Sequence, residues 1–194
     1  MISDEQIKKA NETARNAFEA TKRIYDLAAV ACERMTENIA EQLGLKRENW
    51  LWNSGNTWYL QRYGQLSDSE KTVLKRYCFC NFVETKSRTL PDNVAPFILF
   101  SIATRKFSQQ PSVIYGILRN IEWSEGQKPE VEPFMYEISE RRQQEPLEVS
   151  GVNVLSKRGS ATVEFDFKSL FDITDDTIGD ITNEIVEWFK ARLP

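Results

Sequence analysis

Two carboxylates and a lysine alternate at Glu164, Asp166 and Lys168, in the stretch EFDFK. Metal-dependent nucleases use such a set, because carboxylate oxygens hold Mg²⁺ and the bound metal activates water as a nucleophile. A further carboxylate, such as Glu130 or Glu132, would be needed to complete the site. This motif makes a metal-dependent nuclease one functional hypothesis.

The opposing interpretation is an ordinary strand with one buried and one solvated face. Side chains alternate along a strand, which places Val163, Phe165 and Phe167 on the inner side and the three charged residues on the outer side. This interpretation requires no convergence with residues elsewhere in the chain. The sequence favours it, so no catalytic or metal-binding residue is assigned.

A second concentration of unusual residues lies in NWLWNSGNTWYLQRYG, from position 49 to position 64. Large aromatic rings are usually core, although such clusters also form protein interfaces or, interleaved with cations, surfaces for single-stranded nucleic acid. Lys and Arg outnumber Asp and Glu between 46 and 119, which supports nucleic-acid binding as a further alternative. The candidate contacts for a ligand or partner are Trp50, Trp52, Trp58, Tyr59 and Arg62.

Composition excludes several common mechanisms. Histidine is absent, which removes His-based acid/base catalysis, Ser-His and Cys-His pairs and nearly all common zinc sites. The three cysteines include Cys78 and Cys80, which offer too few ligands for a metal, and we expect free, buried thiols. The chain has neither a GxxxxGK[ST] loop nor a GxGxxG sequence, so no nucleotide or other cofactor is predicted.

A long helix is predicted over the first domain, residues 1–44. Ser3 and Gln6 have the spacing of a capping box, and Gly44 suits the left-handed position after a helix end. Apolar and small residues recur at helical spacing, at Ile7, Ala10, Ala14, Ala17, Ile24, Ala28, Ala31 and Met35. This stripe is too long for a compact domain to cover, so we expect it to pack on another helix, from this chain or from a second copy in a coiled-coil dimer.

The second domain, residues 45–194, contains short aromatic and β-branched segments separated by turn signals. Strands are predicted near 50–52, 57–62, 72–84, 96–104, 112–123, 147–155 and 160–167. An amphipathic helix follows from Thr174, with Ile181, Ile185 and Phe189 on one face. The expected fold is α+β, with an antiparallel sheet of about five to seven strands between a long N-terminal and a C-terminal helix.

These observations favour a non-enzymatic binding or adaptor protein. It would self-associate through the N-terminal helix and hold a protein or small ligand on its sheet. No segment has the apolar length of a membrane span or the apolar core of a signal peptide, so we expect a cytoplasmic protein without membrane contact.

Overall fold

The computed structural model describes residues 3–53, 77–84, 90–91, 93–101, 111–126, 131, 133–135, 137–138, 150–156 and 158–194. Within these ranges, the side chains at 18, 21–22, 25, 29, 47–53, 77–81, 83–84 and 150–152 are not described. The predicted strand at 57–62 lies outside the described residues, as do Glu130 and Glu132.

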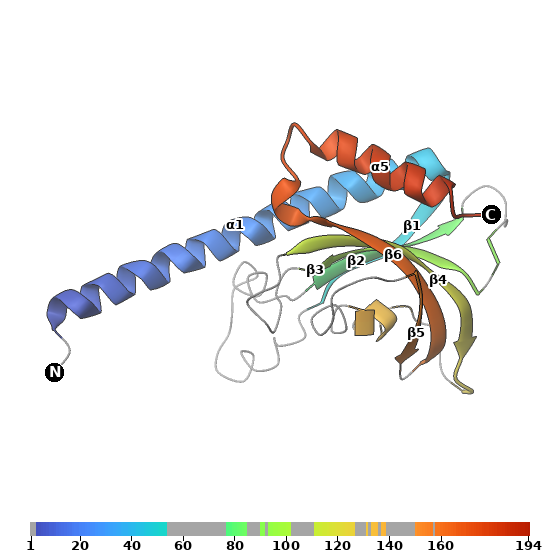
Figure 1. Ribbon diagram of the computed structural model, residues 1–194, viewed down its shortest axis with the longest axis horizontal. Coiled ribbons are helices and arrows are strands. Elements are labelled where there is room, and N and C mark those ends of the chain that lie inside the picture. The colour runs from blue at the N-terminus through green and yellow to red at the C-terminus, as the bar shows by residue number, and fades with distance from the viewer. Residues whose placement is uncertain are drawn as a thin grey trace.

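One antiparallel sheet forms the centre of the fold (Figure 1). Within the described residues, its six strands follow the spatial order β1-β2-β3-β4-β6-β5. Every pair of neighbouring strands is antiparallel, and β5 lies at the edge because it pairs with β6. With its helices, the chain is therefore an α+β protein. The strands are β1 (Leu45–Asn53), β2 (Tyr77–Glu84), β3 (Ala95–Ser101), β4 (Ser112–Trp123), β5 (Ser150–Ser156) and β6 (Gly159–Ser169).

Helix α1 (Asp4–Leu43) begins with the capping box that the sequence predicts. The Ser3 N–H donates to Gln6 Oε1 at 2.9 Å, and the Gln6 N–H donates to Ser3 Oγ at 3.3 Å. The two side chains satisfy backbone donors that have no partner within the helix. At the other end, Gly44 has a φ of 65°, and its N–H donates to the carbonyls of Ala40 and Glu41. Glycine adopts this left-handed conformation without the steric cost of a Cβ.

The second half of α1 and helix α5 (Ile178–Lys190) cover one face of the sheet (Figure 1). Their apolar side chains pack on alternate residues of β3 and β4, because successive strand residues point to opposite faces. We call this cluster the helix-side core. Its buried members include Ala28, Ala31, Met35, Ile39, Ile98, Tyr115, Ile117, Ile181, Ile185 and Phe189.

A second buried cluster covers the other face of the sheet. It joins the remaining alternate residues of β3 and β4 to a short helical segment that includes 133–135. Gly116 lies where β4 passes close to β6, and a Cβ there would be 2.6 Å from the Glu164 carbonyl oxygen and 2.8 Å from Phe97 Cζ. This second core includes Phe97, Leu99, Ile114, Leu118, Phe134, Met135 and Val163.

Because both faces of β4 and β6 are covered, the simple division of β6 into an inner and an outer side is incomplete. Val163 is buried and Phe165 packs against the second core, but Phe167 is 40% exposed. Phe167 lies opposite Ile114, on the same face as Val163, as alternation predicts, but it is only partly covered there. The charged residues of β6 lie on the face that α5 covers.

Candidate functional site

The backbone register determines which way Glu164, Asp166 and Lys168 face. Asp166 lies opposite Tyr115, whose side chain belongs to the helix-side core, and its two charged neighbours flank it at a spacing of two residues. All three charged residues of β6 are consequently directed toward the layer of helices. Two of their partners, Glu184 and Arg192, lie on α5 or just beyond its end.

Glu164 is held by two arginines from distant parts of the chain. Its Oε1 lies 2.8 Å from Arg192 Nε, beyond the end of α5, and its Oε2 lies 3.6 Å from Arg119 Nε on β4. The carboxylate is only 28% exposed. Arg119 also donates to the Arg192 carbonyl oxygen at 2.6 Å.

Aromatic rings continue this cluster along the surface of α5. The Arg192 guanidinium carbon lies 4.4 Å from the centre of the Trp188 ring, in a cation–π contact. The Trp188 ring contacts the Tyr115 ring edge to face, with ring centres 5.4 Å apart. The chain of contacts from Glu164 to Tyr115 fastens the end of the C-terminal helix to the sheet.

The other two charged residues of β6 also have partners. Lys168 Nζ lies 2.5 Å from Glu184 Oε2 on α5, and Asp166 Oδ1 accepts a hydrogen bond from the Phe167 N–H at 2.7 Å. Burial, followed by the nearby charge of Asp166, raises the pKa of Tyr115 above its ordinary value. The motif is thus built into ion pairs and hydrogen bonds.

The described residues also contain no group of three or more His, Cys, Asp and Glu side chains placed to hold a metal ion. A nuclease site on β6 would need its carboxylates directed at a common point. Glu164 instead faces two arginines and Lys168 faces a glutamate of another element.

Only part of the aromatic candidate set falls within the described backbone. Trp50 and Trp52 lie on β1, opposite Cys80 and Cys78 of β2. Trp58, Tyr59 and Arg62 lie outside the described residues. Among the described strands, β1 lies at an edge of the sheet, and an edge offers backbone groups to an incoming partner.

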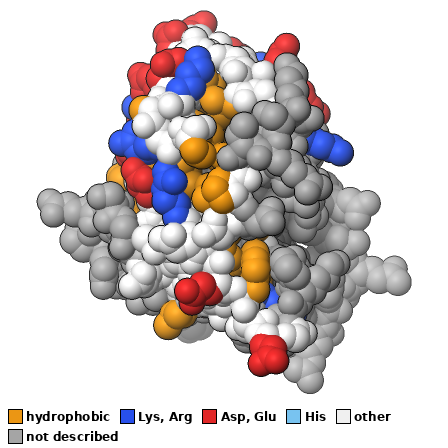
Figure 2. Space-filling model, turned by 90° about the vertical axis from the view of Figure 1, so that its right-hand side faces the viewer, with side chains coloured by type: hydrophobic (Ala, Val, Ile, Leu, Met, Phe, Trp, Pro, Cys, Tyr) orange, Lys and Arg blue, Asp and Glu red, His pale blue; other side chains and the backbone are white. Residues whose placement is uncertain are grey.

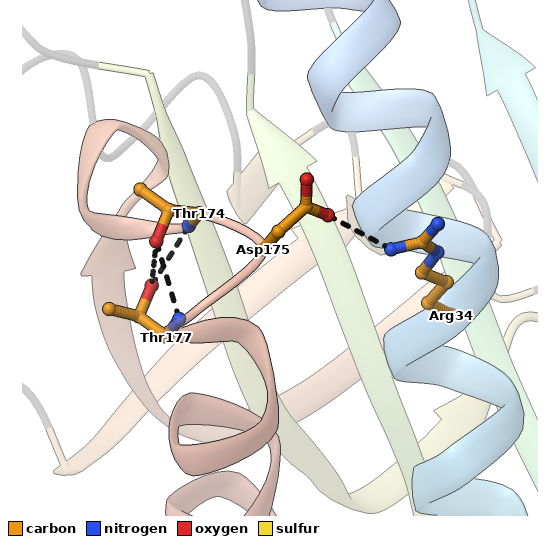
Figure 3. Close-up of polar contacts among 4 residues, drawn as sticks. All are labelled: Arg34, Thr174, Asp175 and Thr177. Atoms are coloured by element: carbon orange, nitrogen blue, oxygen red, sulfur yellow. Dashed lines mark hydrogen bonds and ion pairs between the residues drawn. The ribbon is translucent and has the colours of Figure 1, made fainter.

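The turn before α5 positions a contact with α1 (Figure 3). Thr174 and Thr177 each accept a hydrogen bond from the other's backbone N–H, at 3.3 and 2.8 Å. Asp175, between them, reaches Arg34 of α1 at 3.1 Å. Both partners of this ion pair are largely exposed, so it adds little stability.

The surface at the C-terminal end of the molecule carries charges of both signs among hydrophobic side chains (Figure 2). On the described part of this face, Lys and Arg do not form a broad basic field. A binding surface for nucleic acid normally gathers cations on one face. Of the eleven Lys and Arg residues between 46 and 119, only Lys46 and Arg119 have described side chains, so a basic binding face in this part of the chain stays a prediction.

The first half of α1 is the longest exposed stretch among the described residues. From Asp4 to Arg23, every side chain that the structure describes is exposed, and this half stands clear of the sheet in Figure 1. Ile7 is 49% exposed. By contrast, Ala28 and Met35, farther along the same stripe, are fully buried in the helix-side core.

Sequence reasoning did not find the Glu164, Arg119 and Arg192 cluster. Glu164 lies 45 positions after Arg119 and 28 positions before Arg192, and the three residues share no motif. Only the docking of the C-terminal helix brings them together. A signal was available for Trp188 and Arg192, whose spacing of four places them on one helical face.

Comparisons with protein-family models, with curated proteins and with solved structures found no match. Within the described residues, no helix combines the length and the apolar character needed to cross a membrane. The function must accordingly be argued from the residues and their geometry.

Proposed function

We propose that this protein is a non-enzymatic binding or adaptor protein that self-associates through the first half of α1. The observation that supports the proposal is the exposed stripe of that segment. Helices of this length gain most of their stability in proteins from packing of an apolar face, and this half has no such packing among the described residues.

The charges of the segment are segregated from the stripe. At 100° per residue, every charged residue between positions 4 and 27 falls within an arc of about 140° around the helix. Carboxylates and cations on that arc are spaced for helix-stabilising pairs three and four residues apart. The charged residues are Asp4, Glu5, Lys8, Lys9, Glu12, Arg15, Glu19, Lys22, Arg23 and Asp26.

The uncharged side contains Ile7, Ala10, Ala14 and Ile24. A solvated helix would not need this separation, whereas a helix that packs on a partner does. Farther along α1, from Ala28 onward, the same stripe packs on α5 and the sheet. Part of the stripe therefore already forms an apolar contact within the fold.

The second part of the proposal, binding of a protein or small ligand on the sheet, rests on the residue types at the edge. Trp50 and Trp52 lie on β1, and tryptophan is enriched where interfaces concentrate their binding energy. No enzymatic chemistry is proposed, and no metal or other cofactor is assigned.

Sedimentation equilibrium at micromolar concentration tests self-association. We expect the parent protein to have a mass above that of one chain. Ala14→Glu places a charge in the exposed stripe and should shift the equilibrium to the monomer, because burying that charge in a helix contact is unfavourable.

Asn16→Glu is the matched control, since residue 16 is also exposed but lies on the charged side of the helix. It should assemble like the parent. A parent protein that is monomeric throughout the concentration range would refute the proposal.

A further inference from the structure

We propose that two copies pair through the first halves of their α1 helices in an antiparallel arrangement. Ile7 of each copy would lie opposite Ile24 of the other, and Ala14 opposite Ala17. This inference rests on the proposed self-association and specifies its geometry.

The antiparallel direction follows from the position of α5 and the sheet, which cover the second half of α1. The stripe continues without a break into Ala28, Ala31 and Met35, whose side of the helix is covered by α5 and the sheet. A second helix laid parallel on the first half would therefore run into this body, and its own body would meet the first helix. In the antiparallel arrangement, the two bodies lie at opposite ends of the paired segment.

The register follows from the symmetry of the stripe ahead of the buried part of α1. Ahead of the fully buried Ala28, the stripe runs from Ile7 to Ile24. Its midpoint lies between residues 15 and 16. Four of its five apolar residues are symmetric about this point, since Ile7 pairs with Ile24 and Ala14 with Ala17, whereas Ala10 lies opposite Thr21.

In this register, each helix ends where the body of the other copy begins. Position 4 of one copy lies opposite Leu27 of the other, which is partly buried against the helix-side core, so the paired segment ends at the edge of the body. Ile24 is partly buried and packs against the helix-side core. Ile7 of the second copy would extend that apolar cluster, which makes the new contact continuous with an existing one.

The residue types suit this pairing. Alanines at the centre allow the helix axes to approach to the short end of the usual range, about 8 Å. The larger isoleucines lie near the two ends, where each meets another isoleucine. The charged arc of each helix faces away from the contact, so no charged side chain of the segment becomes buried.

Disulfide trapping between two variants tests the direction. Ile7→Cys and Ile24→Cys would be mixed in equal amounts and oxidised with diamide, and the linked peptides identified by mass spectrometry. Antiparallel pairing should give mainly links between position 7 and position 24, at least tenfold above links between identical positions. Because the two cysteines are on different chains, every such link is intermolecular.

A second mixture, Ala14→Cys with Ala17→Cys, covers the case in which Ile24→Cys disturbs the fold, since positions 14 and 17 are both exposed. It should give links between position 14 and position 17. The control mixture, Lys8→Cys with Arg23→Cys, combines two exposed positions that lie opposite each other in the same register but on the charged side, and should give few links.

The outcomes separate this inference from the proposal beneath it. Links between identical positions, or an assembly without stripe links, would overturn the antiparallel register and leave self-association standing. A protein that sediments as a monomer would overturn both.

Discussion

Replacement of one alanine in the buried half of the α1 stripe gives the sharpest test of the fold. Ala28 is fully buried in the helix-side core, whereas Ala14 lies in the same stripe about four helical turns earlier and is exposed. The same change to glutamate at both positions therefore inserts the same side chain into two different environments. We expect a large loss of stability from the change at position 28 and almost none from the change at position 14.

At position 28 the glutamate would replace a fully buried alanine of the helix-side core. Overpacking of a core costs about 1–3 kcal/mol, and burial of a polar group without a hydrogen bond costs about 1–3 kcal/mol in proteins. Together these give a loss of about 2–6 kcal/mol, against a total stability of about 5–15 kcal/mol for a typical protein. Each kcal/mol lowers the Tm by about 2–4 °C in a chain of this length, so we expect a decrease of about 5–20 °C.

At position 14 the glutamate stays in water, so the free energy of unfolding of the monomer should change by no more than about 0.5 kcal/mol. Thermal and urea melts followed by circular dichroism provide the measurement, at a concentration where the Ala14→Glu protein is monomeric. If Ala28→Glu melted within about 2 °C of the parent, the packing of α1 on α5 and the sheet would be refuted.

Further predictions concern the sheet and its cluster. Gly116→Ala should destabilise the fold by more than about 2 kcal/mol in urea melts, because its Cβ meets the backbone of β6 at 2.6 Å; a melt like that of the parent would contradict this close approach. Arg192→Ala should lower the free energy of unfolding by about 1–2 kcal/mol, because the cation–π contact and the ion pair are lost, and Arg192→Lys should recover part of this loss. If both variants melted like the parent, the cluster would not hold α5. Because the folded state raises the pKa of Tyr115, that group's contribution to stability is complete below the unfolded tyrosine pKa of about 10 and is lost as the pH rises further. When the free energy of unfolding is measured from pH 8 upward, it should therefore fall less in Tyr115→Phe than in the parent. No cleavage of DNA or RNA is expected with Mg²⁺ or Mn²⁺, and cleavage abolished by Asp166→Ala in a folded protein would restore the nuclease hypothesis.

Local signals in the sequence were sufficient for the helices and for the class of fold. The pair Ser3 and Gln6, together with Gly44, marks the ends of α1, because capping depends on residues within one turn of the helix end. The strand at 112–123 follows from a long β-branched and aromatic run. The division into domains 1–44 and 45–194 and the contact role of Trp50, Trp52, Trp58, Tyr59 and Arg62 stay predictions.

The tertiary structure decided which side chains meet. Alternation along β6 separates Glu164 from Val163, but it cannot show that a helix covers the charged side as well. The stripe of α1 reads the same at Ala14 and at Ala28, yet one is exposed and the other is buried. Periodicity is a property of neighbouring residues, whereas cover depends on segments more than a hundred residues away, which only the folded chain brings into contact.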